Sequence, residues 1–72
     1  MDPFKDCNRL YSHHFGVRMR ERYLPDAQVS TALRDGEKIQ KKKGEFIIRW
    51  NRWNLAVSIG NCILVLKTAY RD

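Results

Sequence analysis

Long apolar runs are missing from this 72-residue chain. A membrane-spanning helix needs about 20 consecutive apolar residues, and a signal peptide needs an apolar core of about 7 to 15. The first ten residues, MDPFKDCNRL, contain instead the acids Asp2 and Asp6. The sequence therefore predicts no contact with a membrane, and we expect the protein in the cytoplasm.

Cysteine is also scarce, because Cys7 and Cys62 are the only two and belong to no CxxC motif. Metal sites usually gather closer sets of thiolates and imidazoles. The adjacent His13 and His14 would point about 100° apart on a helix, so one ion is not easily held by both. We therefore expect no metal or other cofactor and, in the cytoplasm, two reduced thiols.

Acidic residues are outnumbered, since eight Asp and Glu stand against fourteen Lys and Arg and leave a formal net charge of +6. Such an excess attracts polyanions, so RNA is the expected partner, although the charge can also serve solubility alone. The chain suffices for one domain, residues 1–72, with little stability to spare. A homodimer or a protein partner would add buried surface.

Proline and glycine are few and fall at expected boundaries. Four-residue spacing predicts a helix from Asn8 to about Tyr23 with a buried stripe of Tyr11, Phe15, Met19 and Tyr23. Pro25 starts a second, shorter helix whose buried face holds Val29, Ala32 and Leu33. Gly36 ends that helix, because glycine readily takes the left-handed conformation.

Beyond Gly36 the hydrophobic period changes to two. Two-residue turns at Asn51-Arg52 and Gly60-Asn61 would keep the apolar residues on one face. The predicted opposed pairs are Trp50 with Trp53, Ile48 with Leu55, Ile59 with Cys62, and Leu55 with Leu66. The predicted core face holds Phe46, Ile48, Trp50, Trp53, Leu55, Val57, Leu64 and Leu66, and the same alternation puts Thr68 and Tyr70 on it. The opposite face is mixed, and its Ile47, Ile63 and Val65 indicate that a helix or another protein covers part of it.

These patterns together predict an α+β fold in three parts. Residues 1–9 form an N-terminal extension, residues 10–36 form two helices, and residues 37–72 form a twisted antiparallel sheet of three to four strands.

The stretch SHHFGVRMRER places His14, Arg18 and Arg22 at successive four-residue steps along the border of the predicted stripe. An imidazole titrates near neutral pH, and guanidinium groups bind phosphate oxygens, so the three are candidates for phosphate chemistry. The alternative is an ordinary helix edge, whose long side chains lie over apolar residues while their charges reach water.

Three motifs carry a resemblance to a known family. They are H-x3-R-M-x2-R at His14, Arg18, Met19 and Arg22, A-L-R-D-G-E at Ala32 to Glu37, and V-L-K-T-A-Y at Val65 to Tyr70. Residues 11–71 thereby resemble a small domain-of-unknown-function family grouped with the RelE and BrnT toxins, whose wider superfamily includes barnase-like ribonucleases. The resemblance implies a RelE-like helix-then-sheet fold, metal-independent RNA cleavage and often an antitoxin partner.

RNA cleavage without a metal needs a base, an acid and cations for the charge that develops on phosphorus. His14 is the candidate base or acid, and Arg18 and Arg22 are candidate phosphate ligands. The second proton-transfer group is expected from the sheet, with Thr68, Tyr70, Lys67 and Glu45 as candidates. Barnase-like members use a glutamate and a histidine, and RelE-like members use basic residues and tyrosine. This sequence follows neither pattern fully, so a non-catalytic nucleic-acid-binding or protein-interaction module stays open.

Nucleic-acid contacts are expected from Lys41, Lys42, Lys43, Arg49, Lys67 and Arg71. The three consecutive lysines can alternatively protect a sheet edge from aggregation. Trp50 and Trp53 are able to stack on bases, but their alternation favours the core.

Overall fold

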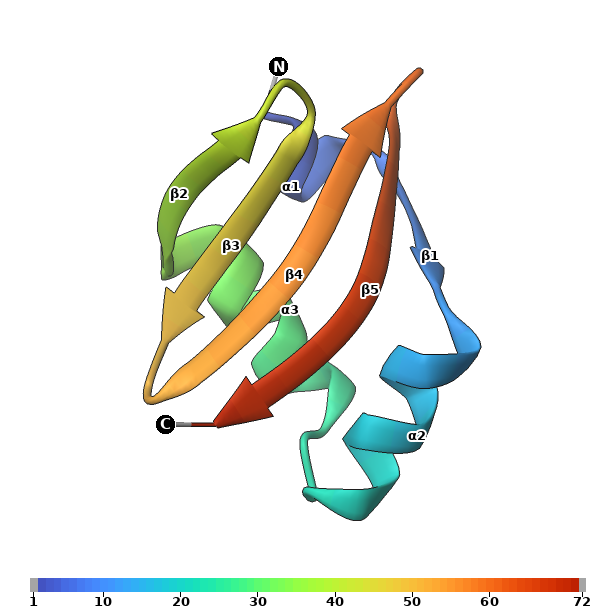
Figure 1. Ribbon diagram of the computed structural model, residues 1–72, viewed down its shortest axis with the longest axis vertical. Helices are drawn as coiled ribbons and strands as arrows, with labels where there is room; N and C mark the ends of the chain where they lie inside the picture. The colour runs from blue at the N-terminus through green and yellow to red at the C-terminus, as the bar shows by residue number, and fades with distance from the viewer. Residues whose placement is uncertain (1, 72) are drawn as a thin grey trace.

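The computed structural model describes residues 2–71 and has an α+β fold. Its helices are α1 (Pro3–Asp6), α2 (His13–Glu21) and α3 (Asp26–Asp35), and its strands are β1 (Asn8–Tyr11), β2 (Glu37–Lys42), β3 (Glu45–Trp50), β4 (Trp53–Gly60) and β5 (Ile63–Arg71). The five strands form one sheet in the order β1-β5-β4-β3-β2. In Figure 1, α1 and α3 lie behind the sheet, α2 lies beyond the edge of β5, and no helix crosses in front of the strands. We call that front side the open face.

The predicted α+β class is confirmed. The predicted number of helices, two, and of strands, three to four, is too low, and the sheet is not purely antiparallel. The described chain has three helices, and its sheet is mixed because β1 runs parallel to β5. The predicted helix from Asn8 is wrong in its first part, since Asn8–Tyr11 pairs with residues 63–66. The four-residue spacing misled because Tyr11, a strand residue, packs edge-on against Phe15 of the helix, with ring centroids 5.6 Å apart.

Ser12 marks the true beginning of the first long helix. Its backbone is extended, and its hydroxyl oxygen accepts a hydrogen bond from the Phe15 amide at 3.0 Å, as an N-cap residue does. The same hydroxyl donates to the Lys67 carbonyl at 2.8 Å. Ser12 therefore starts α2 and fixes it to β5 at one point.

The core lies between the helices and the rear face of the sheet. Six of the eight predicted sheet residues are buried, and Phe46 and Trp50 are half-buried against them. The helices contribute Phe15, Val29, Ala32 and Leu33 to the core, and the connection between α2 and α3 contributes Leu24. The prediction that Tyr23 is buried is wrong. Tyr23 follows α2 with a φ of 54° and is 90% exposed, and Leu24 is buried instead.

The two predicted hairpin turns have different outcomes. The β3–β4 turn is Asn51-Arg52 as predicted, with Trp50 opposite Trp53 and Ile48 opposite Leu55. Its residues have φ values of 50° and 69°, so Arg52 adopts the left-handed conformation of a primed turn. The β4–β5 turn is Asn61-Cys62 instead of Gly60-Asn61, and Ile59 consequently lies opposite Leu64 and not Cys62.

A β-bulge at Lys67 corrects the predicted register of the last strand. Val57 lies opposite Leu66 and Ala56 opposite Thr68, so Lys67 is the extra residue. Beyond the bulge the alternation is reversed. Because the shifted turn moves the register by two residues and the bulge by one more, Leu55 pairs with Ala69, which is 1% exposed, instead of with Leu66. Thr68 and Tyr70 therefore lie on the open face and not on the core face.

Gly36 ends α3 as predicted, but for another reason. Its φ is −71°, so the left-handed conformation is not used. A Cβ atom here would lie 2.5 Å from the Ala32 carbonyl oxygen and 2.8 Å from a methyl carbon of Ile48. The glycine is therefore required because the backbone passes so close to the core.

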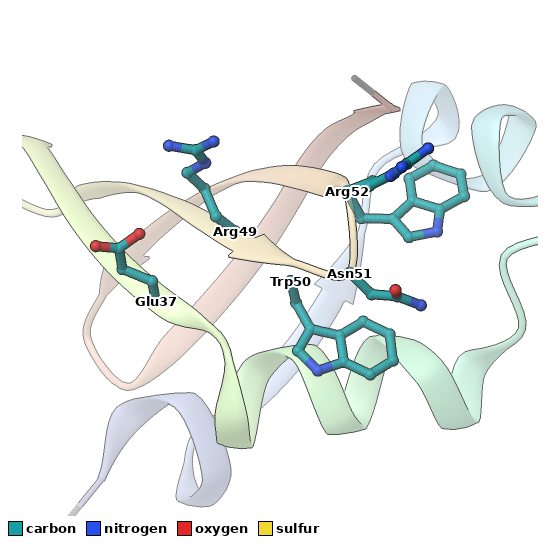
Figure 2. Close-up of a pocket in the computed structure, with 6 residues that line it drawn as sticks. Glu37, Arg49, Trp50, Asn51 and Arg52 are labelled. Carbon is teal, nitrogen blue, oxygen red and sulfur yellow. The ribbon is translucent and has the colours of Figure 1, made fainter.

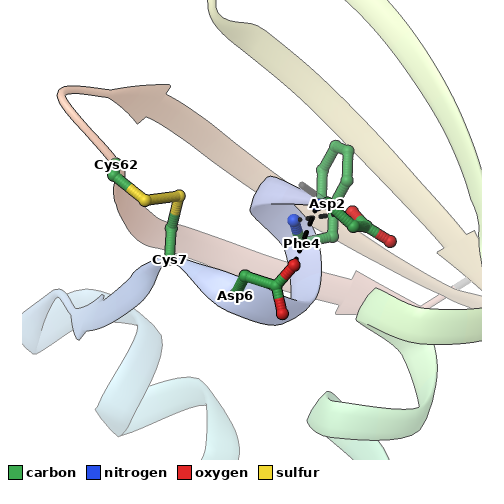
Figure 3. Close-up of a disulfide and its surroundings, with 5 residues drawn as sticks. All are labelled: Asp2, Phe4, Asp6, Cys7 and Cys62. Carbon is green, nitrogen blue, oxygen red and sulfur yellow. Dashed lines mark hydrogen bonds between the residues drawn. A yellow bond between two sulfur atoms is a disulfide. The ribbon is translucent and has the colours of Figure 1, made fainter.

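The expectation of reduced thiols is wrong. Cys7 and Cys62 form a disulfide with a Cα–Cα distance of 4.7 Å, joining the end of α1 to the β4–β5 turn (Figure 3). The bond spans 55 residues of sequence, and a cross-link of that length typically stabilises a domain by about 2 to 4 kcal/mol. The sequence gives no indication of this disulfide, because the two cysteines are brought together only when β1 pairs with β5 in the folded protein.

Leu55→Ala should lower the free energy of unfolding by about 2 to 5 kcal/mol, because Leu55 is 0% exposed at the centre of the sheet. Urea unfolding followed by tryptophan fluorescence measures the change. Leu10→Ala is the control, since Leu10 is 58% exposed and its truncation should change stability by less than about 0.5 kcal/mol. Equal effects of the two variants would contradict the observed packing.

Candidate nucleic-acid interface

The most basic feature of the described chain is the β2–β3 hairpin. Lys41, Lys42 and Lys43, which we call the lysine tip, are exposed at the end of β2 and in the following turn. Gly44 completes the turn with a φ of 77°, and β2 is irregular between Gln40 and Lys42. None of the three lysines forms an ion pair with another residue of the described range. Their charges are therefore available to an external anion.

A second candidate site lies at the β3–β4 turn, at the other end of β3. A surface pocket of about 320 Å³, which we call the turn pocket, is lined by Glu37, Arg49, Trp50, Asn51, Arg52 and Trp53 (Figure 2). In Figure 2, Arg49 and Trp50 project to opposite sides of β3, and Glu37 comes from the neighbouring strand. The lining thus carries two guanidinium groups and one carboxylate, which leaves one positive charge in excess.

Sequence reasoning missed Arg52 as a site residue. Arginine is uncommon at a position with positive φ, so nothing in the sequence marks Arg52 as more than a turn residue. Together with Arg71, whose guanidinium carbon lies 5.4 Å from the centre of the Trp53 ring, it adds to the positive charge at this end of the sheet. The preceding residue, Asn51, was likewise counted only as a turn residue.

The two indoles belong mainly to the core. Trp53 is only 4% exposed, and Trp50 is half-buried against the core cluster. The structural interpretation of these residues is therefore confirmed, and Trp53 offers no free ring face for stacking on a base.

The predicted catalytic residues on the helix are brought close to one another. His14 and Arg18 lie on successive turns of α2, and Arg22 is the C-cap, whose amide donates to the Arg18 carbonyl. His14 is exposed, and its imidazole has no hydrogen bond or ion pair to another residue of the range 2–71. Arg18 already has a partner, with 3.7 Å between its guanidinium and the Glu21 carboxylate. Within residues 2–71, no side chain therefore orients His14 as a general base is usually oriented.

The predicted sheet residues lie elsewhere. Thr68 and Tyr70 face Ala56 and Asn54 on the open face, and Tyr70 is 47% exposed. Lys67 forms an ion pair of 3.3 Å with Glu45, across β4. No hydrogen bond within the described chain links these residues to His14. The predicted catalytic set is thus divided between α2 and the open face, and none of its members lines the turn pocket. Of the predicted nucleic-acid contacts, Arg49 lines it.

A polar network fastens β1 to α3. The Tyr11 hydroxyl donates to the Asp26 carboxylate, and the Arg9 guanidinium donates to the Ser30 hydroxyl at 2.7 Å. Burial of the Tyr11 ring raises the pKa of its hydroxyl, and the hydrogen bond to Asp26 raises it further. The residues are 15 and 21 positions apart, and no local sequence signal connects them.

Tyr11→Phe tests this network through its pH dependence. Because the folded protein holds the pKa of Tyr11 above its ordinary value, the neutral phenol stabilises the fold below about pH 10, and this contribution is lost as the pH rises further. Below pH 10 the variant should be about 0.5 to 1.5 kcal/mol less stable than the wild type, and the difference should shrink above pH 10. Urea unfolding at each pH measures it. Tyr23→Phe is the matched control, since Tyr23 is 90% exposed, and a constant difference for Tyr11→Phe would contradict the assignment.

Two classes of site receive no support from residues 2–71. No group of three or more His, Cys, Asp or Glu side chains is close enough to hold a metal ion. No helix in that range is long and apolar enough to cross a membrane.

Comparison of the chain with protein-family models, with curated proteins and with solved structures finds no match in any of the three. The resemblance to the RelE and BrnT toxins therefore stays a prediction, and the function has to be argued from the chain's own residues.

Proposed function

We propose that this protein binds RNA through the lysine tip and the turn pocket. The observation that carries the proposal is the lysine tip, which holds three adjacent, exposed cations that no carboxylate of the described chain neutralises. The three positive charges of these lysines correspond to half of the formal net charge of +6. Binding to phosphates releases the counterions condensed on RNA, and this supplies affinity without base recognition.

The arrangement of the two sites favours an extended ligand. The lysine tip precedes β3, and the turn pocket begins at its last residues, Arg49 and Trp50. A six-residue strand rises by about 20 Å, so the sites are separated by about that length. Lys42 of β2 lies opposite Glu45 of β3. Arg49 lies four residues after Glu45 in β3 and therefore on the same face of the sheet. A single strand of RNA lying along the open face would reach both.

Cleavage is a second proposal, in which the protein is a small RelE-like toxin-type ribonuclease. The observation that favours it is the placement of His14 and Arg18 on successive exposed turns of α2, where an imidazole and a guanidinium can approach one phosphate. Turnover would need a further proton-transfer group, and Thr68 and Tyr70 lie on the open face, away from the core side to which α2 contributes Phe15. Geometry thus gives binding the stronger support.

The partners and the compartment belong to the same proposal. An antitoxin, another protein or a second copy of this chain would find apolar surface on the open side of the sheet at Leu10 and Ile63, which are 58% and 42% exposed. The cytoplasm stays a prediction, and the Cys7–Cys62 disulfide weighs against it because such bonds persist mainly in oxidising compartments.

Replacing all three lysines of the tip by glutamine should weaken RNA binding and reduce its salt dependence. At about 0.7 counterions per phosphate contact on a single strand, the slope of log affinity against log salt should fall by up to about 2. Fluorescence anisotropy of a labelled single-stranded RNA at several salt concentrations measures the slope. Arg34→Gln is the control, because Arg34 is an exposed cation on α3 that pairs with Asp35 at 3.0 Å. Affinity that does not depend on salt would contradict the proposed mode.

His14→Ala separates binding from cleavage. If His14 transfers a proton, the variant should lose about 100-fold or more in single-turnover cleavage of an RNA pool in chelator, with little change in affinity. Arg18→Lys should also impair cleavage, because lysine cannot make a bidentate contact with phosphate oxygens. His13→Ala is the matched control, since His13 is the exposed neighbour on the same helix. A wild type that binds RNA but cuts none of it would leave the protein a binder.

A further inference from the structure

The disulfide holds an N-terminal segment that contributes no fully buried side chain. Residues 2–11, which we call the N-terminal strap, comprise α1, Cys7 and β1, and every described side chain among them is half-buried or exposed. The fully buried members of the core cluster are all residues from Phe15 onward, and Phe4 and Tyr11 of the strap pack against the outside of this cluster. The core can therefore stay packed when the strap moves.

Besides the disulfide, the strap is held by contacts at the edge of the core. Phe4 packs edge-on against Phe46 at 5.3 Å between ring centroids, and Tyr11 packs against Phe15 at 5.6 Å. Arg9 and Tyr11 also make the hydrogen bonds to α3. The ladder to β5 covers only four residues. A four-residue helix and a four-residue edge strand are too short to persist alone, so the strap depends on these contacts and on the covalent bond at Cys7.

The bond itself is accessible to solvent reagents. Cys62 is exposed in the β4–β5 turn, and Cys7 is half-buried at the end of α1. Figure 3 shows the bridge at the outer end of the hairpin, next to α1, where the Asp6 and Asp2 carboxylates accept hydrogen bonds from the Asp2 and Phe4 amides. A thiolate can therefore approach the Cys62 sulfur without unfolding of the core.

We infer that Cys7–Cys62 is a site of thiol–disulfide exchange whose reduction by a dithiol releases the N-terminal strap from the folded domain. A thiolate of the dithiol attacks Cys62 Sγ, the protein disulfide breaks, and Cys7 Sγ leaves as a thiolate that takes up a proton. The second thiol then attacks the mixed disulfide, which yields the oxidised dithiol and the Cys62 thiol. Two electrons and two protons pass to the protein.

Opening would end at Ser12, where two bonds hold the chain to β5. The Ser12 amide donates to the Leu66 carbonyl at 3.0 Å, and its hydroxyl donates to the Lys67 carbonyl at 2.8 Å. The edge of β5 from Ile63 to Leu66 would lose its partner strand and offer unpaired backbone groups. The strap thus controls whether one edge of the sheet is open.

Hydrogen exchange of the full-length protein, oxidised and after treatment with dithiothreitol, tests the inference. Amides of residues 8–11 and those of the facing part of β5 should exchange at least about 10-fold faster after reduction, while amides of β3 and β4 keep their protection. Two results would overturn it. One is unchanged protection of the strap, and the other is loss of protection throughout the sheet, which would mean that reduction unfolds the whole domain.

The route of reduction needs a separate measurement. Exchange in the folded state should proceed at the same rate in Ile48→Val, whereas exchange through global unfolding should be several-fold faster in it because Ile48 is fully buried. Trapping of the free thiols with iodoacetamide gives the rate. The Cys7→Ser, Cys62→Ser double variant should show the open strap without dithiol and no response to it. Full protection of the strap in that variant would contradict the role of the disulfide.

Discussion

The course of strand β5 is the constraint on which most of this structure depends. It pairs antiparallel with β4 and parallel with β1, so it joins the N-terminal strap to the rest of the sheet. The turn before it holds Cys62, and its Lys67 carbonyl receives the hydroxyl that fixes the start of α2. The bulge at Lys67 then directs Ala69 into the core and Tyr70 to the open face. The attachment of the strap, the position of α2 and the composition of the open face all follow from this one strand.

The parts of the fold that were predictable depend on residues close together in sequence. Helix α3 follows from a proline at its start and three apolar residues on one face, and the β3–β4 hairpin follows from alternation and a two-residue turn. Strand β1 gave no such signal, because four residues fit a helix or a strand equally and the partner lies 55 positions later. The disulfide, with the same separation, was excluded by assuming a reducing compartment before the fold could bring the two thiols together.

For the candidate site, too, the predictable parts are those that depend on residues close together in sequence. The lysine tip was predictable as an exposed hairpin because a run of cations beside a glycine is a local pattern. The positions of Thr68 and Tyr70 were not, since one inserted residue reverses the alternation and nothing in the letters of β5 marks the bulge. Arg52 escaped notice because sequence preference argues against arginine in a primed turn, whereas the close pairing of Trp50 with Trp53 imposes that conformation.

The open face is less basic than the net charge suggests, and this determines where an RNA strand is attracted first. Glu45 neutralises Lys67 and Glu37 lies opposite Arg49, whereas the lysine tip has no ion pair within the described chain. Glu45 also lies opposite Lys42 in the register, but its carboxylate is engaged by Lys67. At physiological ionic strength charges are screened beyond about 8 Å, so a phosphate near the tip responds to the lysines more than to distant acids. The electrostatic attraction for RNA is therefore strongest at the lysine tip. The open face adds contacts only after the RNA strand has bound there.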